Sequence, residues 1–429
     1  MQRLEIPTTG AIRGRIRPPG SKSITNRALV CAALAAGESI LSGALDSDDT
    51  RLMIAALRRL GIPVDAQAEG QTLGVAGCGG HLPAEQADLW VGNSGTTIRF
   101  LAPTVALGRG EFRLDGTARM RQRPIGDLLE SLETLGASAR SEQANGCPPV
   151  IIAAHGLTGG RAAIRGNVSS QFLSGLLLAA PYAQQPVELE VQGTLVSQPY
   201  VHMTLAVMRT FGVDVAAGDL RRLVVPVGRG YRGCHYPIEP DASAASYFFA
   251  AAAITGGEVT VEGLSRASLQ GDVALVDVLE QMGCQVRDDA SSITVSGRPL
   301  SGITVDMNAI SDTVQTLAAV ALFATGPTTI NAVGHIRHKE TDRISALTTE
   351  LRKLGAGVEE FANGLRIEPG ALHAAEIATY DDHRMAMSLA LVGLRTPGVV
   401  ILDPGCTSKT YPKFFDDLGT LAGVRIAPL

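Results

Sequence analysis

The sequence is poor in cysteine, in aromatic residues and in long apolar runs. Only 6 of its 429 residues are cysteine, and they lack the paired spacing of a disulfide framework or a zinc site. The N-terminus "MQRLEIPTTG" has neither the apolar core of a secretory signal nor the Arg/Ser-rich pattern of a transit peptide. We therefore expect reduced thiols, no bound metal and a cytoplasmic location.

Membrane and nucleic-acid partners are not expected either. The longest apolar runs, "YFFAAAAI" and "LAAVALFA", are far shorter than the roughly 20 residues of a membrane span. The net charge is −5, there is no basic tail, and one tryptophan and seven tyrosines offer little for base stacking. Any anion must be bound by a local cluster of cations.

The clearest pattern is a sixfold internal repeat. A helix-ending phrase, apolar-x-x-apolar-Gly, recurs about every 70 to 76 residues and ends at five glycines, Gly61, Gly136, Gly212, Gly283 and Gly355. A weaker sixth copy, "FDDLG", ends at Gly419. Glycine there predicts a left-handed helix cap, and each of the first five copies is followed by a strand-turn-strand pattern.

A second helix opens each repeat with a short polar start. These starts lie at six positions: Ser23, Thr96, Ser169, Ser243, Asp312 and His383. Each alone is typical of helix capping. If three repeats surround an axis in each of two domains, the helix N-termini gather on one face and attract anions. We expect the N-terminal segments "QRLEIP" and "RGRIRPP" to complete the sixth repeat, which makes the second domain discontinuous.

Cationic side chains concentrate at the same helix starts: Lys22, Arg27, Arg99, Arg123, Lys339, Arg343, Arg384 and Lys409. Ser23 and Arg27 are four residues apart and can share one helix face. Arg119, Arg121 and Arg123 are expected on one extended strip. Asp312 is a helix cap by default, but a carboxylate among cations also suits a general base.

Other catalytic patterns are missing. The chain has no phosphate loop of the form Gly-x-x-x-x-Gly-Lys-Ser/Thr, no dinucleotide-binding Gly-x-Gly-x-x-Gly and no Gly-x-Ser-x-Gly elbow. What remains is proton transfer on small substrates with several negative charges.

Nine motifs together resemble the 5-enolpyruvylshikimate-3-phosphate (EPSP) synthase family of enolpyruvyl transferases. They are "PGSKSITNRAL", "GNSGTTIR", "RMRQRPIGDL", "NVSSQFLSGLL", "SQPY", "DASAASYF", "HKETDRI", "DDHRMAMSLAL" and "CTSKTYPKFF", in the family's order and over the full length. The resemblance implies a two-domain inside-out α/β barrel with three βαβαββ repeats per domain and a hinged cleft between the domains. The implied domains are residues 20–238 and the discontinuous pair 1–19 and 239–429.

The resemblance also implies the reaction. The family transfers the enolpyruvyl group of phosphoenolpyruvate to the 5-hydroxyl of shikimate 3-phosphate by addition and elimination, with domain closure. It implies two small-molecule substrates, no cofactor and, as we expect, a monomer.

Site residues follow from the resemblance, motif by motif. Shikimate 3-phosphate would contact Lys22, Ser23, Arg27, Ser169, Ser170, Gln171, Ser197, Tyr200, Asp312, His335 and Lys339. Phosphoenolpyruvate would contact Lys22, Asn93, Gly95, Arg123, Gln171, Arg343, Arg384 and Lys409. Asp312 would accept the 5-hydroxyl proton, and Glu340, with Lys22 or His383, would move the methyl proton.

Two positions depart from the family pattern. His335 stands where many relatives carry asparagine, and Phe100 stands where proline or leucine is common. Gly95 leaves room beside the phosphoenolpyruvate site, which in this family accompanies inhibition by glyphosate, so we expect inhibition here.

Two alternative functions remain open at this point. One is the sister activity on UDP-N-acetylglucosamine, whose reactive loop cysteine has no counterpart in "LDGTARMRQRP". The other is a non-catalytic anion-binding protein with the same fold, against which the joint presence of Lys22, Asp312, Glu340 and Lys409 argues.

Overall fold

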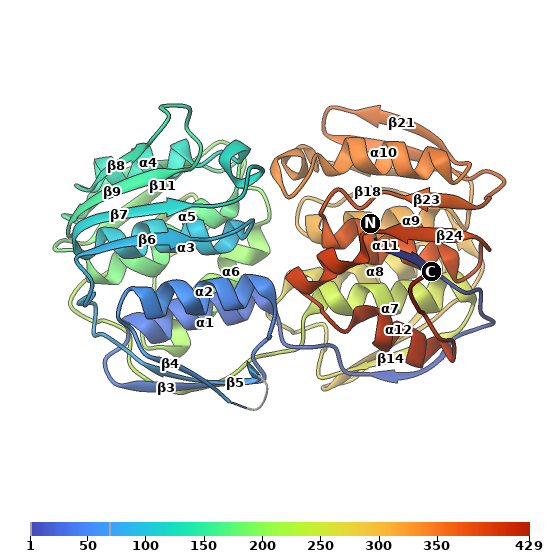
Figure 1. The fold of residues 1–429 in the computed structure, drawn as a ribbon, viewed down its shortest axis with the longest axis horizontal. Coiled ribbons are helices and arrows are strands. Elements are labelled where there is room, and N and C mark those ends of the chain that lie inside the picture. Colours follow the sequence, from blue (N-terminus) through green and yellow to red (C-terminus); the bar gives the residue numbers. More distant parts are fainter. Residues whose placement is uncertain (1, 68–69) are drawn as a thin grey trace. The chain divides into compact units, whose positions relative to one another are not determined.

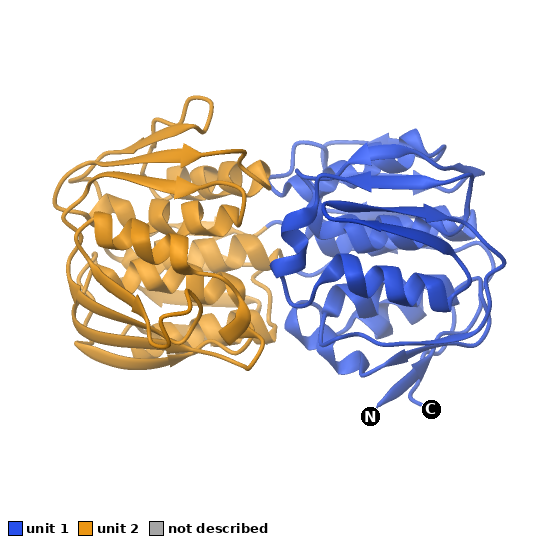
Figure 2. Ribbon diagram, turned by 90° about the horizontal axis from the view of Figure 1, so that it is seen from above, with its two compact units in different colours: residues 1–19, 239–429 blue, residues 20–238 orange. Residues whose placement is uncertain are grey.

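The computed structural model describes residues 2–67 and 70–429. By its internal contacts the chain divides into two compact units (Figure 2). Residues 20–238 form one unit, and residues 239–429 form the other together with the N-terminal segment up to residue 19.

The described residues of the unit 20–238 form three sheets and six α-helices (Figure 1). Its helices are α1 (Lys22–Leu34), α2 (Asp48–Arg59), α3 (Gly95–Ala106), α4 (Gly126–Thr134), α5 (Ser170–Ala179) and α6 (Gln198–Thr210). Its strands are β3 (Glu38–Ser42), β4 (Val64–Gln67), β5 (Thr72–Ala76), β6 (Gln86–Trp90), β7 (Arg109–Asp115), β8 (Ser138–Ser141), β9 (Val150–His155), β10 (Gly160–Arg165), β11 (Val187–Gln192), β12 (Arg222–Val225) and β13 (His235–Pro237). The sheet orders are β13-β3-β5-β4, β6-β7-β9-β8 and β10-β11-β12.

The discontinuous unit repeats this plan. Its helices are α7 (Ala242–Thr255), α8 (Leu275–Gln281), α9 (Val314–Ala321), α10 (Arg343–Lys353), α11 (His383–Gly393) and α12 (Phe414–Ala422). Its strands are β1 (Arg3–Glu5), β2 (Arg13–Ile16), β14 (Glu258–Glu262), β15 (Gln285–Asp288), β16 (Ser292–Ser296), β17 (Leu300–Ser301), β18 (Thr304–Asp306), β19 (Ala324–Thr325), β20 (Thr328–Asn331), β21 (Gly357–Phe361), β22 (Gly364–Glu368), β23 (Ala375–Ile377) and β24 (Val399–Leu402). The main sheets run β15-β16-β14-β2, β18-β20-β22-β21 and β1-β24-β23, and β17 pairs with β19.

One pairing rule is shared by these six main sheets. Each has one parallel pair, such as β6 with β7 or β18 with β20, and the remaining neighbours are antiparallel. Parallel strands need a crossover connection. A helix lies in the connection of four of these pairs, such as α3 between β6 and β7, whereas β2 and β13 reach their partners from a distant part of the chain. The sixfold pattern in the sequence therefore reappears as six similar sheets.

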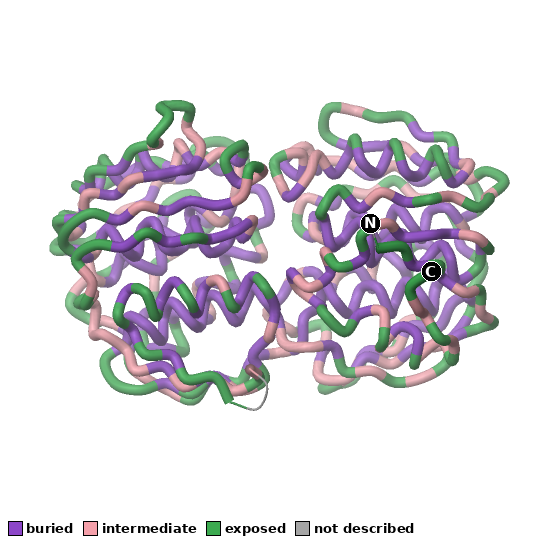
Figure 3. The backbone as a smooth tube through the Cα atoms, in the orientation of Figure 1, coloured by how far each residue is buried: buried purple, intermediate pink, exposed green. Residues whose placement is uncertain are grey.

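Helices rich in small and apolar residues lie inside each unit. Every residue of α1, α3, α7 and α11 is buried, and the backbone tube of Figure 3 has the colour of buried residues along these helices. In the discontinuous unit α7, α9 and α11 contact one another, and in the other unit α1, α3 and α5 do so. Gly175 of α5 allows this close approach, because a Cβ there would collide with the Arg99 carbonyl of α3. A helix buried on all sides needs no polar face.

The helix-ending glycines adopt the predicted left-handed backbone. The φ angles of Gly61, Gly136 and Gly212 are +83°, +97° and +94°, and Gly283 and Gly355 are similar. The sixth copy was predicted wrongly. Helix α12 continues through Gly419 to Ala422, and Gly423, with φ +66°, is its cap.

The N-terminal strands complete two sheets rather than one. Strand β1 pairs with β24 in the last repeat, as expected, but β2 pairs with β14 in the fourth repeat. In the other unit β13 fills the equivalent place beside β3. Each unit thus receives its first parallel strand from a distant part of the chain.

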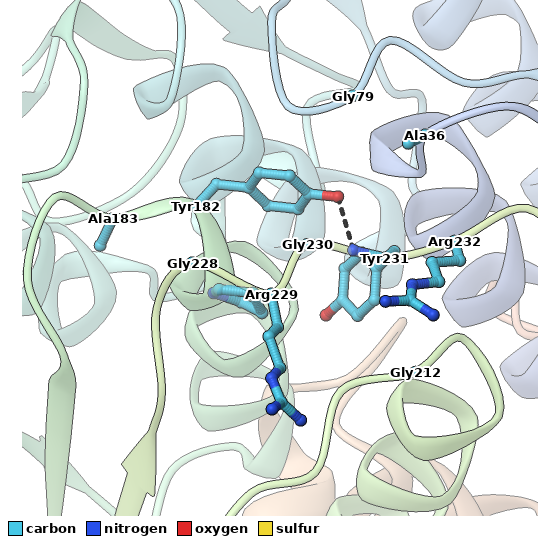
Figure 4. Close-up of a pocket in the computed structure, with 11 residues that line it drawn as sticks. Ala36, Gly79, Tyr182, Ala183, Gly212, Gly228, Arg229, Gly230, Tyr231 and Arg232 are labelled. Atoms are coloured by element: carbon cyan, nitrogen blue, oxygen red, sulfur yellow. Dashed lines mark hydrogen bonds between the residues drawn. The ribbon is translucent and has the colours of Figure 1, made fainter.

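In the unit of residues 20–238, Tyr182 links the end of helix α1 to the backbone at Tyr231. Its hydroxyl donates to the Leu34 carbonyl at the end of α1 and accepts from the Tyr231 amide at 2.8 Å (Figure 4). Its ring lies against Gly230, where a Cβ would be 2.8 Å from Cε1 of the ring. A cavity of about 620 Å³ lies beside it. None of the candidate site residues lines this cavity.

The described residues include no helix long and apolar enough to cross a membrane. They also include no group of three or more acidic, histidine or cysteine side chains placed to hold a metal ion. All six cysteines are free thiols.

Candidate active site

The polar helix starts lie where the repeat predicts, but most of them are not the caps. The caps of α1, α3, α7 and α11 are Ser21, Ser94, Asp241 and Asp382, each accepting from a backbone amide of the first turn. Ser23, Thr96, Ser243 and His383 lie within the first turn instead. Because another residue already caps each helix, these side chains are not needed for capping.

Two arginines converge on the N-terminus of α3. A Cβ on Gly95 would lie 2.5 Å from Nη2 of Arg123 and 2.8 Å from Nη1 of Arg99. Arg123 is buried and donates through Nη1 to the carbonyl and side-chain oxygens of Asn93 at 3.0 and 3.2 Å. Two guanidinium groups thus lie beside the positive end of helix α3, an arrangement suited to an anion.

Gln171 is tied to the same place from α5. Arg99 Nη1 donates to Gln171 Oε1 at 2.8 Å, and Gln171 Nε2 donates to Thr96 Oγ1 at 3.1 Å. Arg99 also donates to the Pro124 carbonyl at 3.3 Å. These bonds fix the orientation of the glutamine amide at the start of its helix.

Lys22 begins α1 and is almost fully buried. Its Nζ lies 3.4 Å from Oδ2 of Asp49, which is 2% exposed in the first turn of α2. A buried ammonium needs a compensating charge, and Asp49 provides it. Asp49 is not predicted from the sequence, although "DSDDT" at residues 46–50 is a recognisable acidic helix start.

Arg27 lies deeper than the sequence suggests. It is 1% exposed and donates to Thr204 Oγ1 at 2.7 Å, to the Ser23 carbonyl at 2.8 Å and to the Tyr200 carbonyl at 3.2 Å. Its guanidinium lies 5.1 Å from the Phe100 ring centre and 5.8 Å from that of Tyr200. Burial lowers the pKa of Arg27 to about 10, so it stays charged at neutral pH.

The remaining candidates of this unit also lie at helix starts. Ser169 caps α5 and Ser170 is its first residue, buried beside Gln171. Ser197 precedes α6 with a left-handed φ of +52°, and Tyr200 is buried in the first turn of that helix. A non-glycine residue in this region stores backbone strain, which marks the position as one fixed by its surroundings.

In the discontinuous unit, several charged side chains gather around Asp312. It lies in a 3₁₀ turn, Ser311–Thr313, and caps no helix. Its carboxylate accepts from Arg384 Nη2 at 2.7 Å and Arg343 Nη1 at 3.2 Å, and Lys339 Nζ lies 3.5 Å away. A 14% exposed side chain can still reach a ligand.

Arg343 joins three carboxylates in this unit. It is 1% exposed, and besides Asp312 it donates to Asp382 Oδ2 and Glu340 Oε2, both at 2.8 Å. Although burial opposes its charge, the Asp382, Glu340 and Asp312 carboxylates raise the pKa of Arg343. Lys409, in the 3₁₀ turn Pro404–Lys409, places Nζ 3.9 Å from Glu340 Oε1.

Two histidines complete the cluster. His335 lies in the 3₁₀ turn Gly334–His338, and burial together with Lys339 lowers its pKa to about 3. It is therefore neutral at physiological pH, an uncharged polar side chain as asparagine would be. His383 is 1% exposed, with Nδ1 3.7 Å from Oδ1 of Asp382.

Comparisons with known proteins agree with this chemistry. The family model described as EPSP synthase (3-phosphoshikimate 1-carboxyvinyltransferase) matches residues 6–418. The chain belongs to the EPSP synthase family. It is 52% identical over 417 residues to the 3-phosphoshikimate 1-carboxyvinyltransferase of Nostoc punctiforme, covering 97% of this chain and 98% of that protein. It is 46% identical to the Shewanella sp. (strain W3-18-1) protein of that name, covering 99% and 100%.

Solved structures confirm the predicted fold class. EPSP synthase from Acinetobacter baumannii is similar with a TM-score of 0.83 and 27% identity, covering 100% of this chain and 99% of that one. The enolpyruvyl transferase NikO from Streptomyces tendae shares the fold with a TM-score of 0.78 at 21% identity.

Within this EPSP synthase family member, the predicted strip of arginines is wrong. A 3₁₀ turn, Met120–Gln122, interrupts residues 119–123. Arg121 is turned to Asp115, at 2.7 Å, while Arg123 is buried against Asn93. Alternation predicts a common face only for an extended chain, and "RMRQRP" is not extended.

Proposed function

We propose that this chain transfers the enolpyruvyl group of phosphoenolpyruvate to the 5-hydroxyl of shikimate 3-phosphate, releasing phosphate. The observation that carries the proposal is the sharing of Arg343 by Asp312 and Glu340, amid Lys339, Arg384 and Lys409. Addition removes the hydroxyl proton and protonates the methylene carbon, and elimination then removes a proton from the resulting methyl group. Two carboxylates that share one guanidinium suit these transfers at two positions.

Both sets of residues are rich in cationic side chains. In the discontinuous unit Lys339, Arg343, Arg384 and Lys409 lie among the carboxylates of Asp312, Glu340 and Asp382. In the other unit the cations are Lys22, Arg27, Arg99 and Arg123, and the Asp49 carboxylate lies near Lys22. These cations suit two substrates that both carry phosphate and carboxylate groups.

We assign roles by motif and geometry. Gly95, Arg123, Arg343, Arg384 and Lys409 bind phosphoenolpyruvate together with Lys22, Asn93 and Gln171. Ser23, Arg27, Ser169, Ser170, Ser197 and Tyr200 hold shikimate 3-phosphate, with His335 and Lys339. Asp312 takes the proton of the attacking hydroxyl. Glu340, beside Lys409, moves the methyl proton with Lys22 or His383.

A phosphate-release assay tests the activity. Purified protein is mixed with phosphoenolpyruvate and shikimate 3-phosphate, and each substrate is omitted in turn. Release that depends on both substrates is expected. If UDP-N-acetylglucosamine replaces shikimate 3-phosphate with an equal or higher rate, the substrate assignment is wrong.

We further propose that glyphosate inhibits the enzyme by occupying the phosphoenolpyruvate site. The close approach of Arg99 and Arg123 to Gly95 supports this, because a Cβ there would press on both guanidinium groups. Gly95→Ala is expected to raise the inhibitory glyphosate concentration by about tenfold or more and to raise the KM for phosphoenolpyruvate. Equal glyphosate inhibition of Gly95→Ala and the wild type would contradict this assignment.

We also propose that the enzyme acts in the cytoplasm as a monomer without a cofactor. Six free thiols suit a reducing compartment. Sedimentation at several protein concentrations tests the monomer, and a concentration-dependent mass would contradict it.

A further inference from the structure

A buried polar cluster lies behind Arg384, at the start of α7. It consists of Asp241, Ser243, Gln270 and Asp272, and we call it the α7 cluster. These side chains are 7%, 3%, 1% and 1% exposed, so solvent does not satisfy them. None of them is assigned a substrate contact above.

Gln270 has one defined amide orientation in this cluster. Its Oε1 accepts from the Ala242 backbone amide at 3.1 Å, so Nε2 must face the other way. There it is within 2.8 Å of Ser243 Oγ and 2.9 Å of Asp272 Oδ2. It also lies 3.1 Å from Asp241 Oδ1. A flipped amide would place Oε1 beside these three oxygen atoms and lose the hydrogen bonds, so the orientation is defined.

Asp272 sets the direction of the Ser243 hydroxyl. The Ser243 Oγ donates to Asp272 Oδ2 at 2.6 Å. A serine has one hydroxyl proton, so the lone pairs of Oγ remain to accept from other groups. Arg384 Nη2 is one such donor, at 3.3 Å from Oγ.

Arg384 Nη2 is therefore held from two sides. Asp312 Oδ2 accepts from it at 2.7 Å, and Ser243 accepts from the other direction. Nη1 donates to Tyr247 Oη at 3.4 Å. The Ser243 and Tyr247 contacts fix the plane of the guanidinium and so the directions in which its other N–H groups can meet an anion.

We propose that Gln270 and Asp272 are positioning residues that orient Arg384 for phosphoenolpyruvate through the hydroxyl of Ser243. The inference rests on the proposed function, because it takes Arg384 as a phosphoenolpyruvate ligand. Asp241 caps α7 by accepting from the Ala244 amide at 3.1 Å, and Gln270 Oε1 accepts from the Ala242 amide, whereas the Ser243 hydroxyl is bonded to Asp272. The cluster thus does more than close a helix.

The test compares Ser243→Ala, Asp272→Leu and the double variant with the wild type. Each single variant is expected to raise the KM for phosphoenolpyruvate by about tenfold, the size of one lost hydrogen bond to a charged group. The KM for shikimate 3-phosphate stays within about twofold. The double variant is no worse than the worse single variant, because Asp272 acts through Ser243.

Ser246→Ala is the matched control. Ser246 lies one turn along α7, is equally buried and bonds the Ser243 carbonyl and Thr316, not Arg384. It is expected to leave the KM for phosphoenolpyruvate unchanged. If Asp272→Leu does not fold, as judged by thermal melting, Gln270→Met takes its place, with the same expected rise and the same expected cycle.

Folded variants with an unchanged KM for phosphoenolpyruvate overturn the inference. Equal rises in both KM values, or additive effects in the double variant, also overturn it. The proposed function fails in a different way, because wild-type protein would then not turn over the two substrates at all.

Discussion

At the scale of single residues, the chemistry depends on charges that are buried and paired. Asp312 keeps its carboxylate between two arginines, and Lys22 keeps its ammonium beside Asp49. Such pairs contribute little net stability, because desolvation offsets the attraction. In the proposed mechanism their value lies in holding Asp312 and Lys22 in a fixed place before substrate arrives.

Asp312→Asn removes the proposed base with little change in shape. We expect kcat to fall by about 100-fold or more, because general base catalysis contributes that much. Steady-state phosphate release measures it. Asp306→Asn, at an exposed carboxylate on β18, is the control and should match the wild type. An Asp312→Asn variant with wild-type kcat would remove the base assignment.

His335 makes stability depend on pH. Burial holds its folded pKa at about 3, below the ordinary 6.5, so below pH 6.5 the unfolded chain binds a proton that the folded chain does not. Stability from this group is full above pH 6.5 and falls as the pH decreases, by about 1 kcal/mol per unit near pH 5.

Urea unfolding of the wild type and His335→Gln at pH 7 and pH 5 tests this. The wild type should lose more free energy of unfolding than the variant on acidification. Identical losses in both proteins would show that His335 is not the group responsible.

At the scale of elements, six helix starts and the six main sheets of the described residues account for the architecture. The small residues of α7 and the glycine of α5 permit close packing, and the positive helix ends then lie beside the cationic side chains. In the unit of residues 20–238, the hydroxyl of Tyr182 joins the end of α1 to the backbone of Tyr231.

Tyr182→Phe should destabilise this unit without altering catalysis. The variant keeps the ring but leaves the buried Leu34 carbonyl and Tyr231 amide without their partner, at a cost of about 1 to 3 kcal/mol. Urea unfolding measures the loss, and kcat at 25 °C checks function. Unchanged stability would mean that other contacts hold the end of α1 and the Tyr231 segment together.

Much of this arrangement was predictable from the sequence, because its helix-ending and helix-starting motifs repeat with a period near 70 residues. The cap glycines and the six helix starts carry local backbone signals. Asp49, Gln270 and Asp272 do not follow that period, and their importance comes only from what they touch. The 3₁₀ turn at Met120 and the placement of β2 likewise depend on tertiary contacts that no local pattern encodes.

At the scale of the whole molecule, the chain builds two units with separate cores from unequal pieces. One unit is continuous, whereas the other needs the N-terminal strands β1 and β2. The Leu4 and Pro428 backbones form a bridge, so both ends of the chain meet within the discontinuous unit.

This topology predicts how pieces of the chain fold. Residues 20–238 alone should unfold cooperatively, because their sheets and core are complete. Residues 239–429 alone should not, since β14 and β24 lose partners, but a chain running 239–429 and then 1–19 should. Circular dichroism melting distinguishes the three. A cooperative transition for 239–429 alone would contradict the need for β1 and β2.

The formation of a carboxyvinyl ether from phosphoenolpyruvate and shikimate 3-phosphate is tested most directly by following the reaction with ³¹P NMR. We expect phosphoenolpyruvate to disappear while free phosphate and a new shikimate-phosphate signal appear in equal amounts. Phosphate without the new ether, or no change in either substrate, would contradict it.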